Sequence, residues 1–252
     1  MNKIPLLFTK KTAPYENKYS FLFDGVTKYF TVPDANDLSF GNGTTDTPFS
    51  ITGWVNLTTF LRGGIIGKYA TGAREWAFDF NGNSKLELAM YDESAGSFIV
   101  SELTSAPTNT NTWNFIAGTY AGDGLETGII VYYNQTTGTV RATSGTYTAM
   151  ENSTAAVEIA RLDPSTFYTS GNIDVLTIWN IALTASEVEE ARNGGIPNDL
   201  TYHSRAANRV SSWAMGEGAT LTSDWAMPDT VGLNNATSVN MVLGDRSTSV
   251  PT

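Results

Sequence analysis

Two carboxylates stand at a spacing that suits acid–base chemistry. Glu75 and Asp79 close the segment Glu75-Trp-Ala-Phe-Asp79, and the period of two in a β-strand places both on one face. Hydrolysis of a glycosidic bond uses two such carboxylates, which flank the bond. Because function follows from a whole site rather than from two residue types, we interpret both as ordinary polar groups at the ends of a strand. We expect a protein that is not an enzyme.

The sequence holds one histidine and no cysteine, and both facts restrict nucleophilic catalysis. A Ser–His triad would have to use His203, and the sequence has no Gly-x-Ser-x-Gly elbow. His203 lies in the polar stretch Tyr202-His-Ser-Arg205, so we expect it to be an exposed surface residue. The lack of cysteine excludes disulfides, thiolate catalysis and cysteine-ligated zinc.

Aromatic side chains in or near predicted loops offer a different chemistry. Aromatic rings stack on sugar rings, while polar neighbours bind the hydroxyl groups. The candidate glycan contacts are Tyr69, Arg74, Tyr91, Asp92, Phe167 and Tyr168, and Phe98 and Asn172 lie near them in the sequence. For any one loop tyrosine, the alternative is a surface aromatic that packs on its own loop. Four tryptophans inside strand patterns are expected in the core instead: Trp54, Trp76, Trp113 and Trp179.

The elements that must position these residues are short strands. Apolar runs alternate with turn residues, and this spacing predicts many antiparallel strands in a sandwich or barrel. The expected strands include Phe49 to Leu57, Trp76 to Phe80, Lys85 to Tyr91, Phe98 to Leu103, Trp113 to Tyr120, Ile129 to Asn134 and Ile173 to Trp179. In the first of these, Phe49, Ile51, Val55 and Leu57 share one face. The run from Ile129 to Tyr133 is apolar on both faces, as expected of a strand that is covered on each side.

One segment has the pattern of a short helix. It runs from Leu183 to Gly194. Thr184 and Glu187 stand three positions apart, which predicts a capping box at its start. Gly194 suits its C-terminal cap.

Composition and charge exclude several classes of partner. The 252 residues are 41% hydrophobic, which is enough for a sizeable core, and only 16% are charged. A formal net charge of −10 without a Lys/Arg cluster argues against nucleic acid and against an anionic membrane surface. No apolar run approaches the length of a membrane span, so we expect no membrane insertion. The patch Leu6-Leu-Phe8 is too short for a signal-peptide core, so we expect synthesis without a signal peptide.

Taken in order, several stretches resemble the concanavalin A-like lectin/glucanase superfamily, and within it the laminin-G and pentraxin type of domain. The stretches are Phe23-Asp-Gly25, Tyr29-Phe-Thr-Val-Pro33, Phe49-Ser-Ile-Thr-Gly-Trp-Val55, Ile65-Ile-Gly-Lys68, Trp113-Asn-Phe-Ile-Ala-Gly-Thr-Tyr120, Val131-Tyr-Tyr-Asn134 and the run from Gly171 to Val188. The resemblance implies an all-β jelly-roll sandwich of two antiparallel sheets with one short helix. We expect an extended N-terminal arm over residues 1–18 and one domain over 19–252. The core motifs of that domain occupy 19–195, and the C-terminal strands in 196–252 pack on the same sandwich.

The resemblance also bears on catalysis and on metals. Glycoside hydrolases of the superfamily carry an acidic residue where this sequence has Ala77, which argues against hydrolysis. Members of the group often hold one Ca²⁺, so a structural Ca²⁺ is left open, while no cofactor is implied. Oxygen ligands are available at Asp24, Asp123, Asp163 and Asp174, although none has the spacing of an EF-hand. The alternative for Asp174 is that it fixes a turn by accepting backbone N–H groups.

Three functions are consistent with these patterns. The first is a non-catalytic structural protein on a bacteriophage virion: a capsid decoration, a head fibre or a tail-associated protein, made in the host cytoplasm. Its partners would be other virion proteins or copies of itself, with glycans of the host or environment as a second ligand. The second is a carbohydrate-binding adhesion module of a bacterial protein, which would be extracellular. The third is a glycoside hydrolase, in which neutralising Glu75 or Asp79 would abolish turnover.

Overall fold

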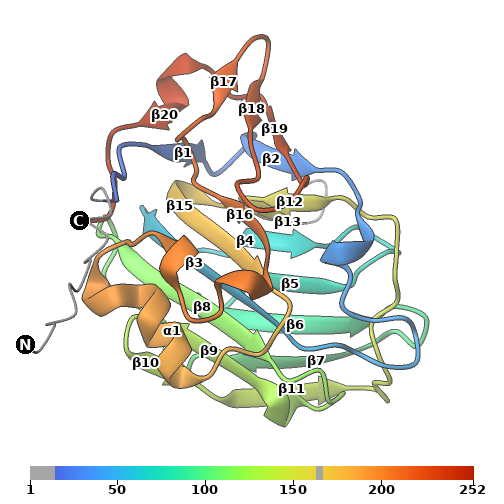
Figure 1. Ribbon diagram of the computed structural model, residues 1–252. Helices are drawn as coiled ribbons and strands as arrows, with labels where there is room; N and C mark the ends of the chain where they lie inside the picture. Colours follow the sequence, from blue (N-terminus) through green and yellow to red (C-terminus); the bar gives the residue numbers. More distant parts are fainter. Residues whose placement is uncertain (1–14, 163–166) are drawn as a thin grey trace, which may run out of the picture.

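The computed structural model describes residues 15–162 and 167–252. These residues form two large antiparallel sheets that pack face to face, so the predicted all-β jelly-roll sandwich is confirmed (Figure 1). The ten strands of one sheet are, in spatial order, β11 (Val140–Ser144), β7 (Ser97–Glu102), β6 (Leu86–Asp92), β5 (Trp76–Phe80), β4 (Gly63–Lys68), β12 (Val157–Ile159), β2 (Tyr29–Val32), β19 (Ala236–Val239), β18 (Trp225–Met227) and β17 (Thr220–Leu221).

The second large sheet has eight strands within the described residues. Their order is β10 (Thr136–Gly138), β9 (Ile129–Tyr133), β8 (Asn114–Tyr120), β3 (Phe49–Leu57), β15 (Ser170–Trp179), β1 (Ser20–Asp24) and β20 (Arg246–Ser247), with β16 (Arg209–Trp213) paired to β15. A separate hairpin joins β13 (Arg161–Leu162) and β14 (Phe167–Tyr168). Short 3₁₀ turns occupy Asn36–Leu38, Glu126–Gly128, Asn193–Gly195, Leu200–Tyr202, Ala206–Asn208 and Leu243–Asp245.

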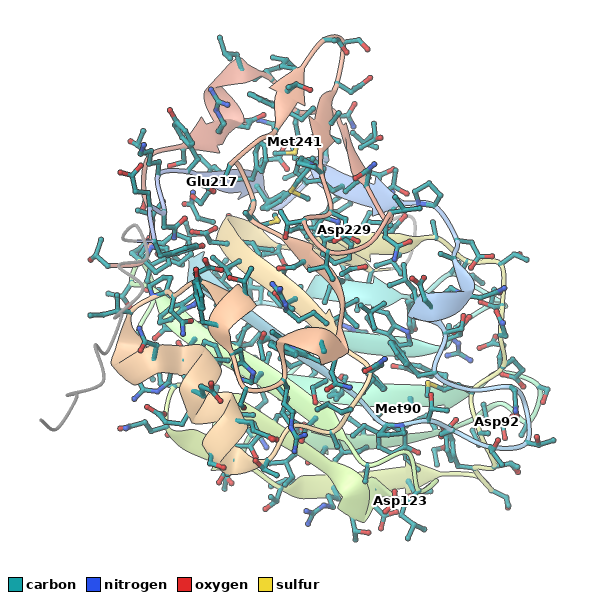
Figure 2. The ribbon with its side chains drawn as sticks, viewed as in Figure 1. Met90, Asp92, Asp123, Glu217, Asp229 and Met241 are labelled. Carbon is teal, nitrogen blue, oxygen red and sulfur yellow. The ribbon has the colours of Figure 1, made fainter. Side chains whose placement is uncertain are left out.

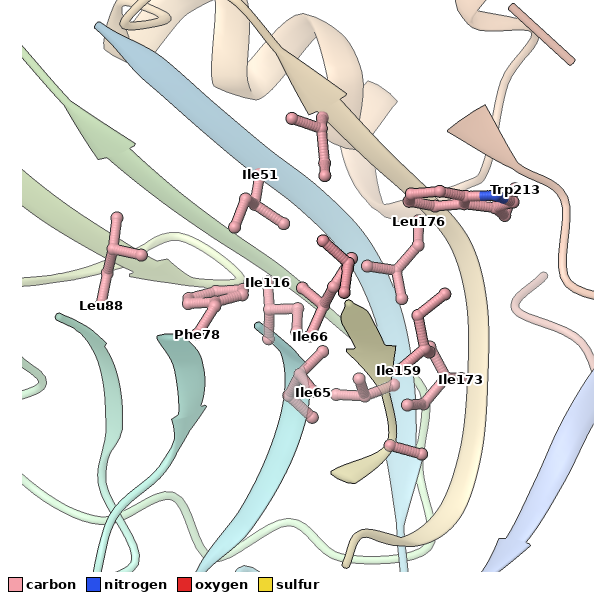
Figure 3. Close-up of a cluster of buried hydrophobic side chains, with 14 of the residues drawn as sticks. Ile51, Ile65, Ile66, Phe78, Leu88, Ile116, Ile159, Ile173, Leu176 and Trp213 are labelled. Atoms are coloured by element: carbon pink, nitrogen blue, oxygen red, sulfur yellow. The ribbon is translucent and has the colours of Figure 1, made fainter. Parts of the chain in front are cut away.

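The main core lies between the two sheets. Phe49, Ile51, Val55 and Leu57 of β3 all point into it, as their alternation predicts. Figure 3 shows how side chains of both sheets interdigitate there, with Ile51, Ile116 and Leu176 on one side and Ile66, Phe78 and Leu88 on the other. This burial of apolar surface is the main source of stability for the sandwich.

A second, smaller core covers the other face of the eight-stranded sheet. Trp54 of β3 and Trp179 of β15 point into it, and α1 (Ala185–Arg192) contributes Val188 and Ala191. Since the sheet is covered on both sides at this point, β9 is apolar on both faces, as predicted. Figure 1 shows α1 lying across this face, outside the sandwich.

Among the described residues, α1 is the one α-helix, and its predicted capping box is present. The Thr184 hydroxyl accepts the Glu187 N–H, and the Glu187 carboxylate accepts the Thr184 N–H at 2.8 Å. The helix ends one residue before the predicted cap, because Asn193 takes the left-handed conformation (φ 48°) ahead of Gly194. Asparagine tolerates this conformation, and its side chain donates to the Ile196 carbonyl at 3.1 Å. No helix in the described ranges is both long and apolar enough to cross a bilayer.

The segment ahead of β1 is held against the eight-stranded sheet. The Asn17 amide donates to the fully buried Asp174 carboxylate at 2.8 Å, and Glu217 accepts the N–H groups of Lys18 and Tyr19. Tyr15 lines a hollow with Val175, on the same side of the sheet as α1. A bulge interrupts β15 here, and Val175 has a φ of 45°. Residues 1–14 of the predicted arm lie outside the described residues, and the division into arm and domain stays a prediction.

Residues 196–252 add strands to both large sheets. β16 pairs with β15, β20 pairs with β1, and β19 pairs with β2. Trp213 and Trp225 are both almost fully buried, and Trp225 packs on Phe21 of β1 with 5.3 Å between ring centroids. Trp213 and Trp225 therefore belong to the main core between the two large sheets.

Candidate functional site

The outer face of the ten-stranded sheet carries the site. Trp76, Phe78 and Phe80 of β5 point into the core, so Ala77 and Asp79 point to the outer face. The strand register extends this into rows across neighbouring strands, because residues directly opposite each other lie on one face. One row is acidic (Asp79, Glu87, Glu102). The next has small side chains (Ala77, Ala89, Val100), and the third is aromatic (Tyr91, Phe98).

The row of small side chains leaves a hollow between the acidic and aromatic rows. This cleft has a volume of about 300 Å³ and is lined by Arg62, Tyr69, Arg74, Glu87, Ala89, Tyr91, Phe98 and Val100. Its lining combines apolar rings with a few charged groups, which is typical of small-molecule sites.

Three aromatic rings form one wall of the cleft. Tyr91 lies between the other two, with ring centroids 5.2 Å from Tyr69 and 6.0 Å from Phe98. The Arg74 guanidinium lies 5.0 Å from the Tyr91 centroid and forms an ion pair with Glu93. Tyr91 thus combines a partly exposed ring with a guanidinium fixed beside it.

The opposite side of the cleft is acidic. Glu87 accepts a hydrogen bond from the Asn81 amide at 2.7 Å, and Glu102 forms an ion pair with Lys85. Asp79 is only 3% exposed, and its carboxylate has no hydrogen-bond partner among the residues that the structure describes. Burial, together with the neighbouring Glu87 charge, raises the pKa of Asp79 well above its usual value. Burial likewise raises the pKa of Glu87.

A hairpin borders the cleft on the side of β4. Glycines at positions 64 and 67 leave room for Leu162 of β13, since a Cβ atom on Gly67 would lie 2.4 Å from the Leu162 side chain. This contact seats the hairpin, so that Phe167 of β14 packs under the Arg62 guanidinium at 3.7 Å from its ring centroid. Arg62 therefore lines the cleft from a fixed position.

The structure brings three of the six predicted glycan contacts together: Tyr69, Arg74 and Tyr91 all line the cleft. Phe167 reaches it only through Arg62. Tyr168 lies on the far side of the hairpin, against Tyr29, and lines a neighbouring hollow of about 210 Å³.

Asp92 lies outside the cleft, at the rim where β6 ends (Figure 2). It is buried, and its carboxylate accepts the N–H groups of Ala95 and Thr148 at 3.0 Å each. Its carboxylate therefore holds two loops together.

Glu87 and Arg62 are site residues that the sequence analysis did not identify. The signal for Glu87 is the alternation Glu87-Leu-Ala-Met-Tyr91, which places Glu87, Ala89 and Tyr91 on one face. The role of Glu87 depends on Asp79, which lies opposite it on β5. The sequence of one strand does not show which strand pairs with it.

Glu75 and Asp79 lie at the two ends of β5, as interpreted, but both are buried. The Glu75 carboxylate lies 2.7 Å from the fully buried Lys68 ammonium and accepts the Ser153 N–H at 2.7 Å. Asp79 faces Glu87 instead. The two acids thus occupy different environments, one beside a lysine and one beside another acid.

His203 is also not the exposed residue that was expected, since it is only 4% exposed. Its ring packs on Trp179, with 4.7 Å between centroids, and Nε2 lies 2.9 Å from the Glu187 carbonyl oxygen of α1. Nδ1 accepts the Arg205 N–H. Nε2 therefore connects the segment after α1 to the helix, while Nδ1 stabilises the turn within that segment.

The described calcium candidates lie apart from one another, and Asp163 falls outside the described residues. Asp24 accepts the N–H groups of Val26, Thr27 and Lys28; although burial raises its pKa, these bonds lower it to about 2. Asp174 accepts one backbone N–H, from Val175, and the Asn17 amide. Over residues 15–162 and 167–252 no three acidic or histidine side chains converge on a common point. Calcium binding stays a prediction.

Comparison with known proteins gives a family and a set of similar folds. Residues 24–189, about two thirds of the chain, match the family described as the concanavalin A-like lectin/glucanases superfamily. A comparison with curated protein sequences finds no match.

Among solved structures, a protein of Bacteroides ovatus to which carbohydrate binding has been ascribed is similar over 90% of this chain, with 16% identity and a TM-score of 0.58. The match spans 59% of that protein's length. A heptameric pentraxin from Limulus polyphemus covers 71% of this chain and 83% of its own, at 12% identity and a TM-score of 0.47. A domain of an extracellular arabinanase from Geobacillus stearothermophilus, solved with arabinotriose, covers 64% and 71%, at 19% identity and a TM-score of 0.42. At these identities the first likeness shows a shared fold, and the other two are more distant.

Proposed function

The chain belongs to the concanavalin A-like lectin/glucanases superfamily, and from this premise we propose that it is a non-catalytic carbohydrate-binding protein. The observation that carries the proposal is the cleft on the outer face of the ten-stranded sheet. A partly exposed ring, Tyr91, stands on one side and a hydrogen-bonding carboxylate, Glu87, on the other. A sugar offers an apolar ring face and hydroxyl groups at its edge, and the two sides of the cleft match these features. The carbohydrate binding ascribed to the Bacteroides ovatus protein of the same fold supports this reading.

The arrangement of acids supports binding rather than hydrolysis. Glycosidases place two carboxylates on either side of the scissile bond. Glu87 is the one carboxylate in the described part of the chain that lines this cleft; Asp79 is buried beside it on the same side. Glu75 is engaged with Lys68, and Ala77 offers no acid.

We expect Tyr91→Ala to weaken glycan binding by about tenfold or more, because it removes the ring at the centre of the aromatic wall. Isothermal titration calorimetry with a panel of soluble polysaccharides and oligosaccharides, neutral, acidic and amino, identifies a ligand and measures the loss. Tyr202→Ala is the matched control, since Tyr202 is 60% exposed and does not line the cleft. The proposal falls if nothing in the panel binds, or if Tyr91→Ala binds as tightly as the native chain.

The finer proposal is that this binding protein is displayed on a bacteriophage virion, attached to other virion proteins or to copies of itself, with an extracellular bacterial adhesion module as the alternative. Anchoring of the N-terminal segment supports it, because Asn17 and Tyr19 are fixed to the sandwich by Asp174 and Glu217. If the arm binds another virion protein, this anchoring would fix the sandwich to that protein.

Light scattering on the full chain and on a chain lacking residues 1–18 tests this attachment. We expect the full chain to form a defined oligomer that the shortened chain does not form. Circular dichroism of the shortened chain is the control, since removal of Asn17 leaves the buried Asp174 with fewer partners. Two stable monomers would argue for the free-standing adhesion module instead.

A further inference from the structure

Asp79 and Glu87 form a pair of carboxyl groups beside the cleft. They lie directly opposite each other on β5 and β6, and both side chains are on the outer face. Asp79 is 97% buried and, within the described ranges, no donor reaches its carboxylate. Neither of its oxygen atoms is fully enclosed, so a donor from outside the chain can reach the carboxylate.

The charged groups around the pair leave it short of positive charge. Arg74 is paired with Glu93, and Lys85 is paired with Glu102. On β6 and ahead of β5, Tyr91 and Tyr69 bring neutral hydroxyls, and the Asn81 amide is neutral too. From the β4 side the groups are Gly64, which has no side chain, Leu162 and Arg62.

Arg62 is the one guanidinium or ammonium that faces the pair without an ion pair among the described residues, and its guanidinium lies over Phe167. Two carboxyl groups therefore share one unmatched cation. Adjacent like charges in a poorly solvated place repel each other, so ionising both carboxyls costs free energy that a second cation would offset.

Resting on the proposed function, we propose that the cleft selects an amino sugar, a glycan unit whose free ammonium lies against Glu87 and supplies the missing positive charge to the Asp79–Glu87 pair. A neutral sugar would use the same aromatic wall but leave the pair unmatched. An acidic sugar would add a third negative charge.

This selection makes binding depend on pH with a definite sign. Burial raises the pKa values of both carboxyls, and so do the charge of Glu87 acting on Asp79 and the charge of Glu102 acting on Glu87. At a pH below these raised values the free protein holds a proton that the ammonium displaces. Binding of the amino sugar therefore releases protons. Its affinity should rise as the pH rises through the raised pKa values, until the sugar's own ammonium loses its proton.

The test compares two ligands of one length: an oligomer of glucosamine and its fully N-acetylated, neutral counterpart. Calorimetry at a pH where the amine is charged should give an affinity about tenfold higher for the amine oligomer. Titrations in two buffers with different ionisation enthalpies should show proton release for that ligand alone.

Glu87→Gln and Asp79→Asn should each reduce the preference for the amine to less than about threefold. Glu189→Gln is the matched control: Glu189 forms an ion pair with Arg192 on α1, which covers the other sheet, and it does not line the cleft, so the preference should persist. Thermal unfolding of each variant separates a lost preference from a lost fold.

The outcomes separate the two proposals. Equal binding of both oligomers, or tighter binding of the acetylated one, overturns the selection for an ammonium but keeps the carbohydrate-binding function. A preference that survives both Glu87→Gln and Asp79→Asn also overturns it. If no glycan of any kind binds, the proposed function itself fails.

Discussion

Replacing Lys68 by methionine is expected to lower the free energy of unfolding by about 3–5 kcal/mol. The Lys68 side chain is fully buried, and its ammonium lies 2.7 Å from Glu75 and 2.8 Å from Asp34. It also donates to the Ser153 carbonyl at 2.9 Å. Methionine fills a similar volume but leaves the Glu75 carboxylate buried without its cation, and an unmatched buried charge is costly.

Urea unfolding of the native and variant chains measures this loss. Lys85→Met is the matched control, because the Lys85–Glu102 pair is partly exposed and should contribute about 1 kcal/mol or less. Adding Glu75→Gln to Lys68→Met removes the orphaned charge and should recover part of the loss. If Lys68→Met costs no more than Lys85→Met, the buried pair does not stabilise the fold as argued.

The second large effect is expected at Trp213, where alanine should cost about 3–5 kcal/mol. Trp213 ends β16 and is fully buried between the sheets, beside Leu176 (Figure 3). Its indole N–H donates to the Asn234 carbonyl at 2.8 Å, so the substitution leaves both a cavity and an unpaired buried carbonyl. Leu233→Ala is the control, because Leu233 is 92% exposed and should change stability by less than about 0.5 kcal/mol.

A chain that ends at residue 195 tests whether the sandwich needs all of the C-terminal strands, including β16 with Trp213. It keeps all of the superfamily match but loses β16 and the strands that pair with β1 and β2. We expect no cooperative unfolding transition in its circular dichroism. A truncated chain that unfolds cooperatively would show that residues 196–252 are an addition to a self-sufficient domain.

The fold could be predicted because its determinants are local. The alternation in Phe49–Leu57 assigns each side chain to one of two cores, and the spacing of Thr184 and Glu187 fixes the start of α1. Such patterns are read within one segment, since they depend on the period of the element and on capping chemistry. The one-residue shift at the helix end reflects Asn193, which can take the left-handed conformation as well as glycine.

The site could be predicted only in part, because it is built across strands. Tyr69, Arg74 and Tyr91 were identified by residue type, whereas Glu87 gains its role from Asp79 on the next strand. His203 was misjudged for a related reason: its neighbours in sequence are polar, but Trp179 and Glu187 bury it from a distance along the chain. Strand register and long-range burial cannot be predicted from the residues of one segment, because both depend on residues that are distant in the sequence.

The place where the N-terminal segment joins the sandwich sets the orientation of the cleft. Tyr15 and Asn17 lie on the side of α1, at the outer surface of the eight-stranded sheet, while the cleft opens on the outer surface of the other sheet. Tyr15 therefore lies on the face of the sandwich opposite the cleft, and an attachment on that face would leave the cleft free. On a support that carries many copies, all clefts would face outward together, and weak individual contacts with a repetitive glycan would add up to firm adhesion.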